Sequence, residues 1–426
     1  MRQHRERIQT ASETQRRRGT EKAPQKICYV RRFLCASASV CFLTMFHVVG
    51  AWAQSTEPNP GLDRPVTTQE LDQLKRKIAD DTRSNIEGIF EYHTETGDLN
   101  NRLDFYRAGA RLNLKLTPAT LLQIRGTHTP YSTENGFLTE RGTNLTLGIR
   151  SQITEGTSLD LEAGGTSFTT DGRTINALAA FGVSPGNLKL RFTGSRSNVE
   201  ESLLSTAGLR PVTGPFAGTL VGLVMDNRFV ADGSYQLLQN ADVFASGGIG
   251  AREGSNVELN WFQTVGGGGG YNFIARADDE PLRLVRASYT ANYVRFDKDL
   301  SGFGGASLVD RQNRVVPLSR LGTDLISPDA APGRAGVGGY FSPRNNFNHV
   351  IRGDIGGRFN PNVEYQVAGF IGSQYYTGSP RRSVNGFSGT VTFWLTDRYS
   401  FPVTFVRDNF GPYTQQSLFA QLIARF

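Results

Sequence analysis

The sequence has 426 residues, of which 20% are charged and 38% are hydrophobic, and its mean hydropathy of −0.34 is too low for a bundle of membrane-spanning helices. All three cysteines, Cys28, Cys35 and Cys41, lie in the first 41 residues, so the rest of the chain has no thiol for a disulfide or a Cys-ligated metal. A helical transporter is therefore excluded, and thiol redox chemistry is excluded if the first 41 residues are removed from the mature protein.

The first 53 residues have the features of a signal peptide. A basic segment that ends at Arg31 and Arg32 precedes the apolar run 33–49, and Ala51-Trp52-Ala53 supplies the small residues of a cleavage site. Ten of the 46 basic and three of the 39 acidic residues lie in this segment, so the remaining chain carries 36 of each. This balance gives no support to nucleic-acid binding.

Residues 54–85 are predicted to form a periplasmic linker and one short helix. The linker is rich in proline and polar residues, and Thr67 to Glu70 match a capping box ahead of Leu71, Leu74 and Ile78 at helical spacing. Two interpretations remain open for this segment: a tether, or a docking helix for a partner.

From residue 86 to residue 426 the apolar pattern has a period of two. In 107–116, alanine and leucine alternate with polar residues, and the last segment, 417–426, alternates in the same way and ends on Phe426. Together with a signal peptide and regular turn signals, this pattern is typical of an outer-membrane barrel with apolar residues toward lipid. We predict an all-β fold, a transmembrane antiparallel β-barrel of about 16 strands in the outer membrane of a Gram-negative-type bacterium.

The predicted strands also fix a topology. They are 86–95, 102–116, 118–129, 142–154, 156–168, 173–184, 186–197, 217–236, 240–251, 258–275, 282–296, 340–355, 362–376, 384–396, 398–409 and 414–426. Connections after the even-numbered strands are short, whereas those after the odd-numbered strands include 130–141, 198–215 and 297–339. The short set is predicted to be periplasmic, with both termini, and the long set exterior.

The sequence carries no strong catalytic motif. His93, His128 and His349 are the histidines after the signal peptide, and no G-x-S-x-G pattern marks a nucleophile near them. The glycine run 266–270 lacks a phosphate-loop context, and the loop that begins at Asp297 has Leu308 where a calcium loop needs glutamate. We predict no enzyme activity, no cofactor and no metal.

Three segments resemble a known family. They are VEESLLSTAG at 199–208, YVRFDKDL at 293–300 and GGYFSP at 338–343, and they resemble, in the same order, exterior segments in the C-terminal barrel of bacterial cellulose synthase operon protein C. The resemblance covers about residues 190–426. The family-like exterior residues are Glu201, Ser202, Leu203, Ser205, Gly208, Asp297, Lys298, Gly339, Tyr340, Phe341, Ser342 and Pro343.

This resemblance implies an outer-membrane porin that exports an exopolysaccharide, cellulose or a cellulose-like glucan, with loops 198–215 and 297–339 covering or gating the exterior mouth. In that family a periplasmic tetratricopeptide-repeat array links the barrel to the synthase, and residues 54–85 contain no 34-residue repeat. The implied partners are a polysaccharide chain, outer-membrane lipid, and a separate periplasmic repeat protein with an inner-membrane glycan synthase. The alternative is a general or small-solute diffusion porin, and an outer-membrane enzyme is the third hypothesis.

Alternation also assigns charged residues to the lumen. The candidates are Arg107, Arg111, Lys115, Arg150, Asp160, Glu162, Lys189, Arg191, Arg286 and Glu364. With Arg425, this set contains eight basic and three acidic residues, a surplus that predicts weak anion selectivity. A lumenal ion-pair network is the other interpretation. Deletion of residues 306–337 is predicted to raise the single-channel conductance.

Overall fold

The computed structural model describes residues 83–97, 103–133, 139–211, 216–276, 280–300, 307–309, 315–317, 336, 338–410 and 413–426. Residues 1–82, which hold the predicted signal peptide and all but the last three residues of the predicted linker and helix segment 54–85, lie outside the described residues. So does most of the segment 306–337 whose deletion is considered above. In the described part of the chain, no helix is both long and apolar enough to cross a membrane.

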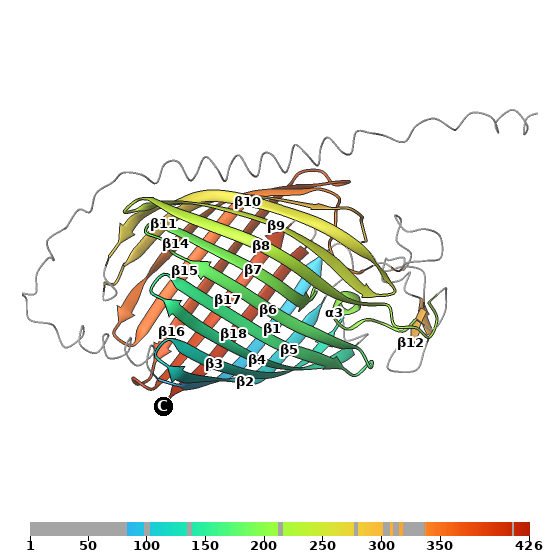
Figure 1. Cartoon of the computed structure of the whole chain (residues 1–426). Helices are drawn as coiled ribbons and strands as arrows, with labels where there is room; N and C mark the ends of the chain where they lie inside the picture. Colours follow the sequence, from blue (N-terminus) through green and yellow to red (C-terminus); the bar gives the residue numbers. More distant parts are fainter. Residues whose placement is uncertain are drawn as a thin grey trace, which may run out of the picture. The chain divides into compact units, whose positions relative to one another are not determined.

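Sixteen antiparallel strands close into a barrel (Figure 1). They are β1 (Asn85–Gly97), β2 (Asp104–Thr117), β3 (Thr120–Ser132), β4 (Thr139–Thr154), β5 (Thr157–Phe168), β6 (Arg173–Val183), β7 (Leu188–Asn198), β8 (Gly222–Leu238), β9 (Ala241–Ser255), β10 (Val257–Ala275), β11 (Leu284–Phe296), β14 (Asn346–Asn360), β15 (Val363–Tyr376), β16 (Arg382–Trp394), β17 (Tyr399–Phe410) and β18 (Tyr413–Arg425). β1 pairs with β18, and the N–H of Phe426 donates to the carbonyl of Ser84 at 2.9 Å beside this seam. The predicted sixteen-stranded all-β barrel is confirmed.

The alternation of the sequence becomes a difference between the two faces of the wall. On β4, Leu145 and Leu147 are 65% and 55% exposed, whereas Thr146 between them is 4% exposed. Side chains at successive strand positions point to opposite faces, so the exposed apolar set covers the outside and the polar set lines the inside. Exposing these apolar side chains to water would cost free energy, whereas their contact with lipid is favourable.

The connections differ at the two ends of the barrel. At one end, which we call the short-turn end, strands are joined mostly by tight turns such as Pro118-Ala119 and Glu155-Gly156, and β1 begins and β18 ends there. The opposite end, the long-loop end, has the connection from β7 to β8 with helix α3 (Leu203–Ala207), and the connection from β11 to β14 with a hairpin of β12 (Ser307–Val309) and β13 (Val315–Pro317). Figure 1 places α3 at the end of the barrel opposite the C-terminus.

Two predicted strand starts are wrong. The strands predicted to begin at residues 217 and 340 begin at Gly222 and Asn346. The backbone of Gly222 has φ 92°, which breaks the extended ladder, and Val221 instead bridges to Leu209 in the preceding loop. Gly339, with φ 67°, and Pro343, which has no N–H to donate, likewise keep 338–343 out of the wall.

Candidate functional site

The strand register places the predicted lumen residues on the inner face, where many of them pair with carboxylates. Arg111 lies 3.1 Å from Glu87 on β1, and Arg286 lies 2.6 Å from Asp242 on β9. Near the short-turn end, Arg150 and Arg191 share Asp160, at 3.0 and 2.7 Å. The inner wall therefore holds cross-strand ion pairs, and the exposed ones are weak individually.

The eight-to-three charge count from the sequence is incomplete. Regularly paired inward positions hold fourteen basic residues, Arg107, Arg111, Lys115, Arg125, Arg150, Lys189, Arg191, Arg228, Arg252, Arg286, Arg352, Arg358, Arg382 and Arg425, and twelve acidic residues, Glu87, Glu91, Glu95, Glu140, Asp160, Glu162, Asp226, Asp232, Asp242, Asp354, Glu364 and Asp408. Two further carboxylates come from Glu200 and Glu201 after β7. Among the residues that the structure describes, the surplus of basic residues therefore disappears, and with it the reason to expect anion selectivity.

Segments from two connections fold together at the long-loop end. We call this assembly the cap, and it consists of the described residues 199–211 and 216–221 after β7 with 297–300 and 338–343 before β14. Its centre is apolar, since Leu204 is 0% and Tyr340 is 1% exposed. The cap forms one buried cluster with wall residues on β2, β3, β5, β8, β10 and β11, including Phe105, Tyr131, Phe168, Val224, Phe262 and Phe296.

Local sequence explains the fold of the helical part of the cap. Ser202 and Ser205 form a capping box, in which the Ser205 N–H donates to the Ser202 hydroxyl at 3.1 Å and the Ser202 N–H donates to the Ser205 hydroxyl at 3.0 Å. The helix stops at Gly208, where φ is 75° and a Cβ would lie 2.8 Å from the Leu220 side chain. A glycine is therefore needed both for the backbone conformation and for the space.

Glu200 attaches the cap to one side of the wall. Its carboxylate accepts hydrogen bonds from Arg107 at 2.7 and 2.8 Å and from the Tyr131 hydroxyl at 2.9 Å. Arg107 also pairs with Glu91 on β1 at 2.8 Å. These charge-assisted bonds join the loop after β7 to strands β1, β2 and β3.

Glu201 attaches the cap to the other side. Its carboxylate accepts from Arg252 on β9 at 2.9 Å and from the N–H of Phe341 at 2.6 Å. Arg252 also donates to Asp226 on β8 at 3.0 Å, and its guanidinium lies 4.7 Å from the centre of the Tyr340 ring. Arg252 is thus the point at which the wall and both loops of the cap meet.

The second loop has its own polar support. Asn260 on β10 donates to the carbonyl of Lys298 at 2.9 Å and to the Tyr340 hydroxyl at 3.3 Å, and the N–H of Leu300 donates to Ser342 at 2.9 Å. Burial raises the pKa of the Tyr340 phenol, so the ring stays neutral inside the cap. A Cβ at Gly339 would lie 2.8 Å from the Ser202 hydroxyl, which shows how closely the loops approach.

The family-like residues are therefore brought together from two loops that are far apart in sequence. Glu201, Ser202, Leu203, Ser205 and Gly208 form the first half of the cap. Asp297, Lys298, Gly339, Tyr340, Phe341, Ser342 and Pro343 lie in the second half. Sequence reasoning missed Arg252, because the predicted strand ended at residue 251, and it missed Asp226, which alternation within the predicted strand 217–236 would have placed on the inner face.

The inner face of β14 to β18 has a different character. Among the described residues, these strands contribute nothing to the buried cluster of the cap. Neutral hydrogen-bonding pairs, such as Thr390 with Thr404 at 2.9 Å and Gln374 with Asn346 at 3.0 Å, lie there beside the ion pairs of Arg352 with Asp354 and of Arg358 with Glu364. Hydroxyl and amide groups of this kind exchange readily with water and with sugar hydroxyls.

One histidine lies beside a serine and a glutamate, the combination that the enzyme hypothesis requires. His93 on β1 lies 2.8 Å from the Ser417 hydroxyl through Nδ1 and 3.1 Å from Glu95 through Nε2. Ser417 lies inside the ladders that β18 forms with β1 and β17, so its backbone is committed to strand pairing and offers no free pair of N–H donors for an oxyanion. We assign no catalytic step to these residues.

Residues 109–305 match the family model described as "Cellulose synthase operon protein C C-terminus". This match confirms the resemblance predicted from the sequence, and it includes the first two of the three segments on which that resemblance was based. A comparison with curated proteins finds no matching relative.

The solved structures found to be similar are distant in sequence. A "Bacterial polysaccharide outer membrane secretin" is similar, with a TM-score of 0.55 and 11% identity over 81% of this chain and 99% of that one. OccAB1 from Acinetobacter baumannii has a TM-score of 0.41 with 10% identity, covering 82% and 97% of the two chains. The CymD monoaromatic hydrocarbon channel has a TM-score of 0.38 with 10% identity, covering 87% and 95%. At such identities the likeness concerns the fold alone.

Proposed function

We propose that this barrel, which carries the C-terminal domain of the cellulose synthase operon protein C family over residues 109–305, is an outer-membrane porin that exports a polysaccharide, cellulose or a cellulose-like glucan. The observation that carries the proposal is the match of this family to a closed sixteen-stranded barrel with a polar interior. By the rule that outer-membrane barrels keep short turns in the periplasm, the short-turn end is periplasmic and the cap is exterior.

Transport through this barrel needs no bond to be made or broken. A sixteen-stranded barrel is wide enough for an aqueous lumen, and an extended glycan can thread it. The neutral amides and hydroxyls of β14 to β18 offer many weak partners, and Arg352 and Arg358 on the same arc are paired with carboxylates. A sugar chain can therefore exchange one set of hydrogen bonds for the next. This arc, away from the buried cluster of the cap, is the proposed path of the chain.

The cap is the proposed gate of this path. Glu200 holds it to Arg107 and Glu201 holds it to Arg252, and the apolar centre around Leu204 excludes water between loop and wall. An emerging chain would pass beside the cap or displace it, and the two glutamate attachments set the free energy of displacement. A general diffusion porin, the alternative function, has no need of a mouth covered in this way.

The proposal requires secretion and coupling to synthesis. Residues 1–53 are proposed as the signal peptide, and residues 54–85 as a periplasmic segment that meets a partner. The proposed partners are the polysaccharide, the lipid of the outer membrane, a separate periplasmic repeat protein and an inner-membrane glycan synthase.

Deletion of the gene from its native host tests the function. Exopolysaccharide released by the deletion strain should fall sharply compared with the parent, and a plasmid copy should restore it. Uptake of small sugars and antibiotics should stay the same, since export and general diffusion are separate activities. Unchanged exopolysaccharide together with reduced small-solute uptake would favour the diffusion porin.

A further inference from the structure

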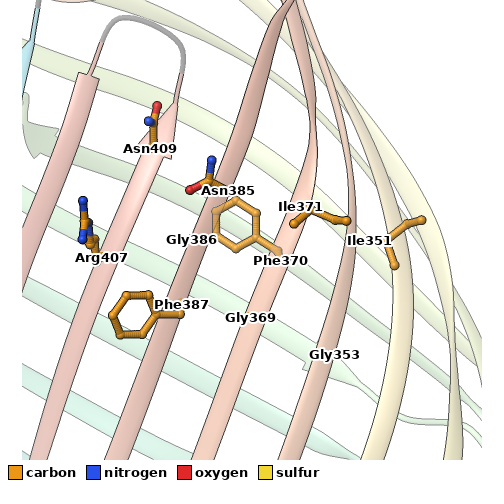
Figure 2. A pocket seen from close by; sticks show the side chains of 10 residues that line it. All are labelled: Ile351, Gly353, Gly369, Phe370, Ile371, Asn385, Gly386, Phe387, Arg407 and Asn409. Carbon is orange, nitrogen blue, oxygen red and sulfur yellow. The ribbon is translucent and has the colours of Figure 1, made fainter.

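The outer face of the wall carries a groove that the transport path does not use. It has a volume of about 600 Å³ and lies across β14 to β17 (Figure 2). Its lining residues include Ile351, Gly369, Phe387, Arg407 and Asn409. The strand register places these five side-chain positions on the outward, lipid-facing side of the barrel.

The groove exists because two paired positions lack side chains. Gly353 faces Gly369 across β14 and β15, while the rows on either side are Ile351 with Ile371, and Ile355 with Val367. Ile351 and Ile371 are 59% and 68% exposed and form one apolar ridge, and Ile355 and Val367, which are 46% and 49% exposed, form the other. The space between the ridges therefore suits an extended hydrocarbon chain.

One end of the groove is cationic and polar. Phe387 pairs with Gly369, and Arg407 is the next residue in the same row, on β17. Asn385 and Asn409 pair with each other in the adjacent row toward the long-loop end. Arg407 is exposed, and among the residues that the structure describes it has no hydrogen-bond or ion-pair partner.

A second cation lies on the same face, one row nearer the long-loop end than Ile351 and Ile371. The Arg381 guanidinium donates to the Ser373 hydroxyl at 2.8 Å and lies 3.1 Å from the His349 ring nitrogen Nε2. The face therefore changes from apolar ridges to a polar, cationic group as it approaches the loops. An amphiphile with phosphate at its head matches this order of groups.

We propose that this face binds a phosphorylated glycolipid of the outer leaflet, of the lipid A type, with an acyl chain over Gly353 and Gly369 and a phosphate on Arg407. An arginine on a lipid-facing surface is unfavourable unless it lies near the head groups or meets an anion, and its planar fork matches phosphate well. The inference rests on the proposed function, because only an outer-membrane barrel with its long loops outward would present this face to that leaflet.

Native mass spectrometry of the refolded full chain in maltoside micelles tests the site, with purified bisphosphorylated lipid A and its dephosphorylated form as probes. The unmodified barrel should prefer the phosphorylated probe. Arg407→Gln should weaken its binding about tenfold, as expected for loss of a charge-assisted contact. Arg295→Gln is the matched control, because Arg295 is also exposed on the outer face near the long-loop end but lies beside no glycine pair.

A second variant tests the acyl groove with the charge intact. A Cβ at Gly353 meets nothing within 4 Å, and one at Gly369 comes only to 3.7 Å from a carbonyl, so Gly353→Leu with Gly369→Leu should fold and fill the groove. This double variant should also lose lipid A binding, whereas Gly126→Leu, an open outward position on β3, should not.

Equal binding of the two probes, or unchanged binding by both Arg407→Gln and the filled-groove variant, would overturn the site. Heat-modifiable gel mobility checks that each variant is folded. Exopolysaccharide export by Arg407→Gln should equal that of the unmodified protein. A failure of the lipid site is therefore seen separately from a failure of the export function, which the gene deletion measures.

Discussion

The two ends of the barrel use the same chemical pair, an arginine with a carboxylate, in different surroundings. At the long-loop end the Arg252 side chain is 11% and Asp226 2% exposed, and a third partner, Glu201, belongs to the cap. At the short-turn end Arg150 and Arg191 are 68% and 46% exposed, and both pair with Asp160 within the wall. The first ion-pair cluster joins a loop to the barrel, whereas the second links only strands of the wall and is exposed to solvent.

The comparison shows that two features determine the structural role of an ion pair: its burial, and whether its partner belongs to the wall or to a loop. Removing one member of a buried pair leaves an uncompensated charge away from water, at a cost of roughly 3–5 kcal/mol. An exposed pair is screened by solvent and contributes about 0–1 kcal/mol. Variants at the two ends therefore measure the contrast directly.

Arg252→Ala should have the largest effect. It leaves Glu201 and Asp226 without their shared cation and removes the guanidinium from the Tyr340 ring. The cap should detach from β9, so single-channel conductance in a planar bilayer should rise and chymotrypsin should cut after Tyr340, which is 1% exposed in the closed cap. Heat-modifiable mobility would verify that the barrel still closes. A folded variant with unchanged conductance and no cleavage would contradict the attachment.

Gly222→Ala should loosen the cap by a steric route. The backbone at this position has φ 92°, and an added Cβ would lie 2.1 Å from the Leu204 carbonyl. The strain should cost on the order of 1–3 kcal/mol and push α3 away from β8, with the same gain in conductance and cleavage but to a smaller extent. Gly247→Ala, where a Cβ meets nothing within 4 Å, is the control. Equal behaviour of the two alanine variants would argue against this packing.

Ion selectivity should be weak in the unmodified protein. In the described part of the chain, fourteen inward basic residues are matched by twelve acidic strand residues and the two glutamates of the cap. The reversal potential across a salt gradient should therefore lie close to zero. Changing Arg107, Arg111 and Lys115 together to glutamate reverses three charges and should give clear cation selectivity. Strong anion selectivity of the unmodified barrel would mean that the inner charge balance is wrong.

Arg150→Gln should have the smallest effect. The side chain is largely exposed, and Asp160 keeps Arg191 as a partner at 2.7 Å. Conductance, chymotrypsin cleavage at Tyr340 and the temperature of the mobility shift should all match the unmodified barrel, since such pairs contribute about 0–1 kcal/mol. If Arg150→Gln changed conductance and cleavage as much as Arg252→Ala does, the proposed difference between the two ends of the barrel would be wrong.

Some of the cap could have been read from the sequence, and some could not. The Ser202 and Ser205 pair and the glycine at 208 are local signals, and the resemblance pointed to both loops before their contacts were known. The role of Arg252 could not be predicted from nearby sequence. The predicted end of its strand was wrong by four residues, and no motif surrounds Arg252 in the sequence. The pairing of Arg107 with Glu200 could not be found locally either, because Glu200 lies 93 residues away in a loop.

The sequence by itself determined the wall. A strand has a side-chain period of two, so alternation fixes which residues face lipid, and the parity of short and long connections fixes the number and direction of the strands. Tertiary structure decided the cap and the charge balance. Glu201 meets Arg252 from 51 residues away and Phe341 from 140 residues away, and such contacts form only when the closed barrel brings both loops into one mouth. The alternation of residues along a single strand cannot predict these contacts.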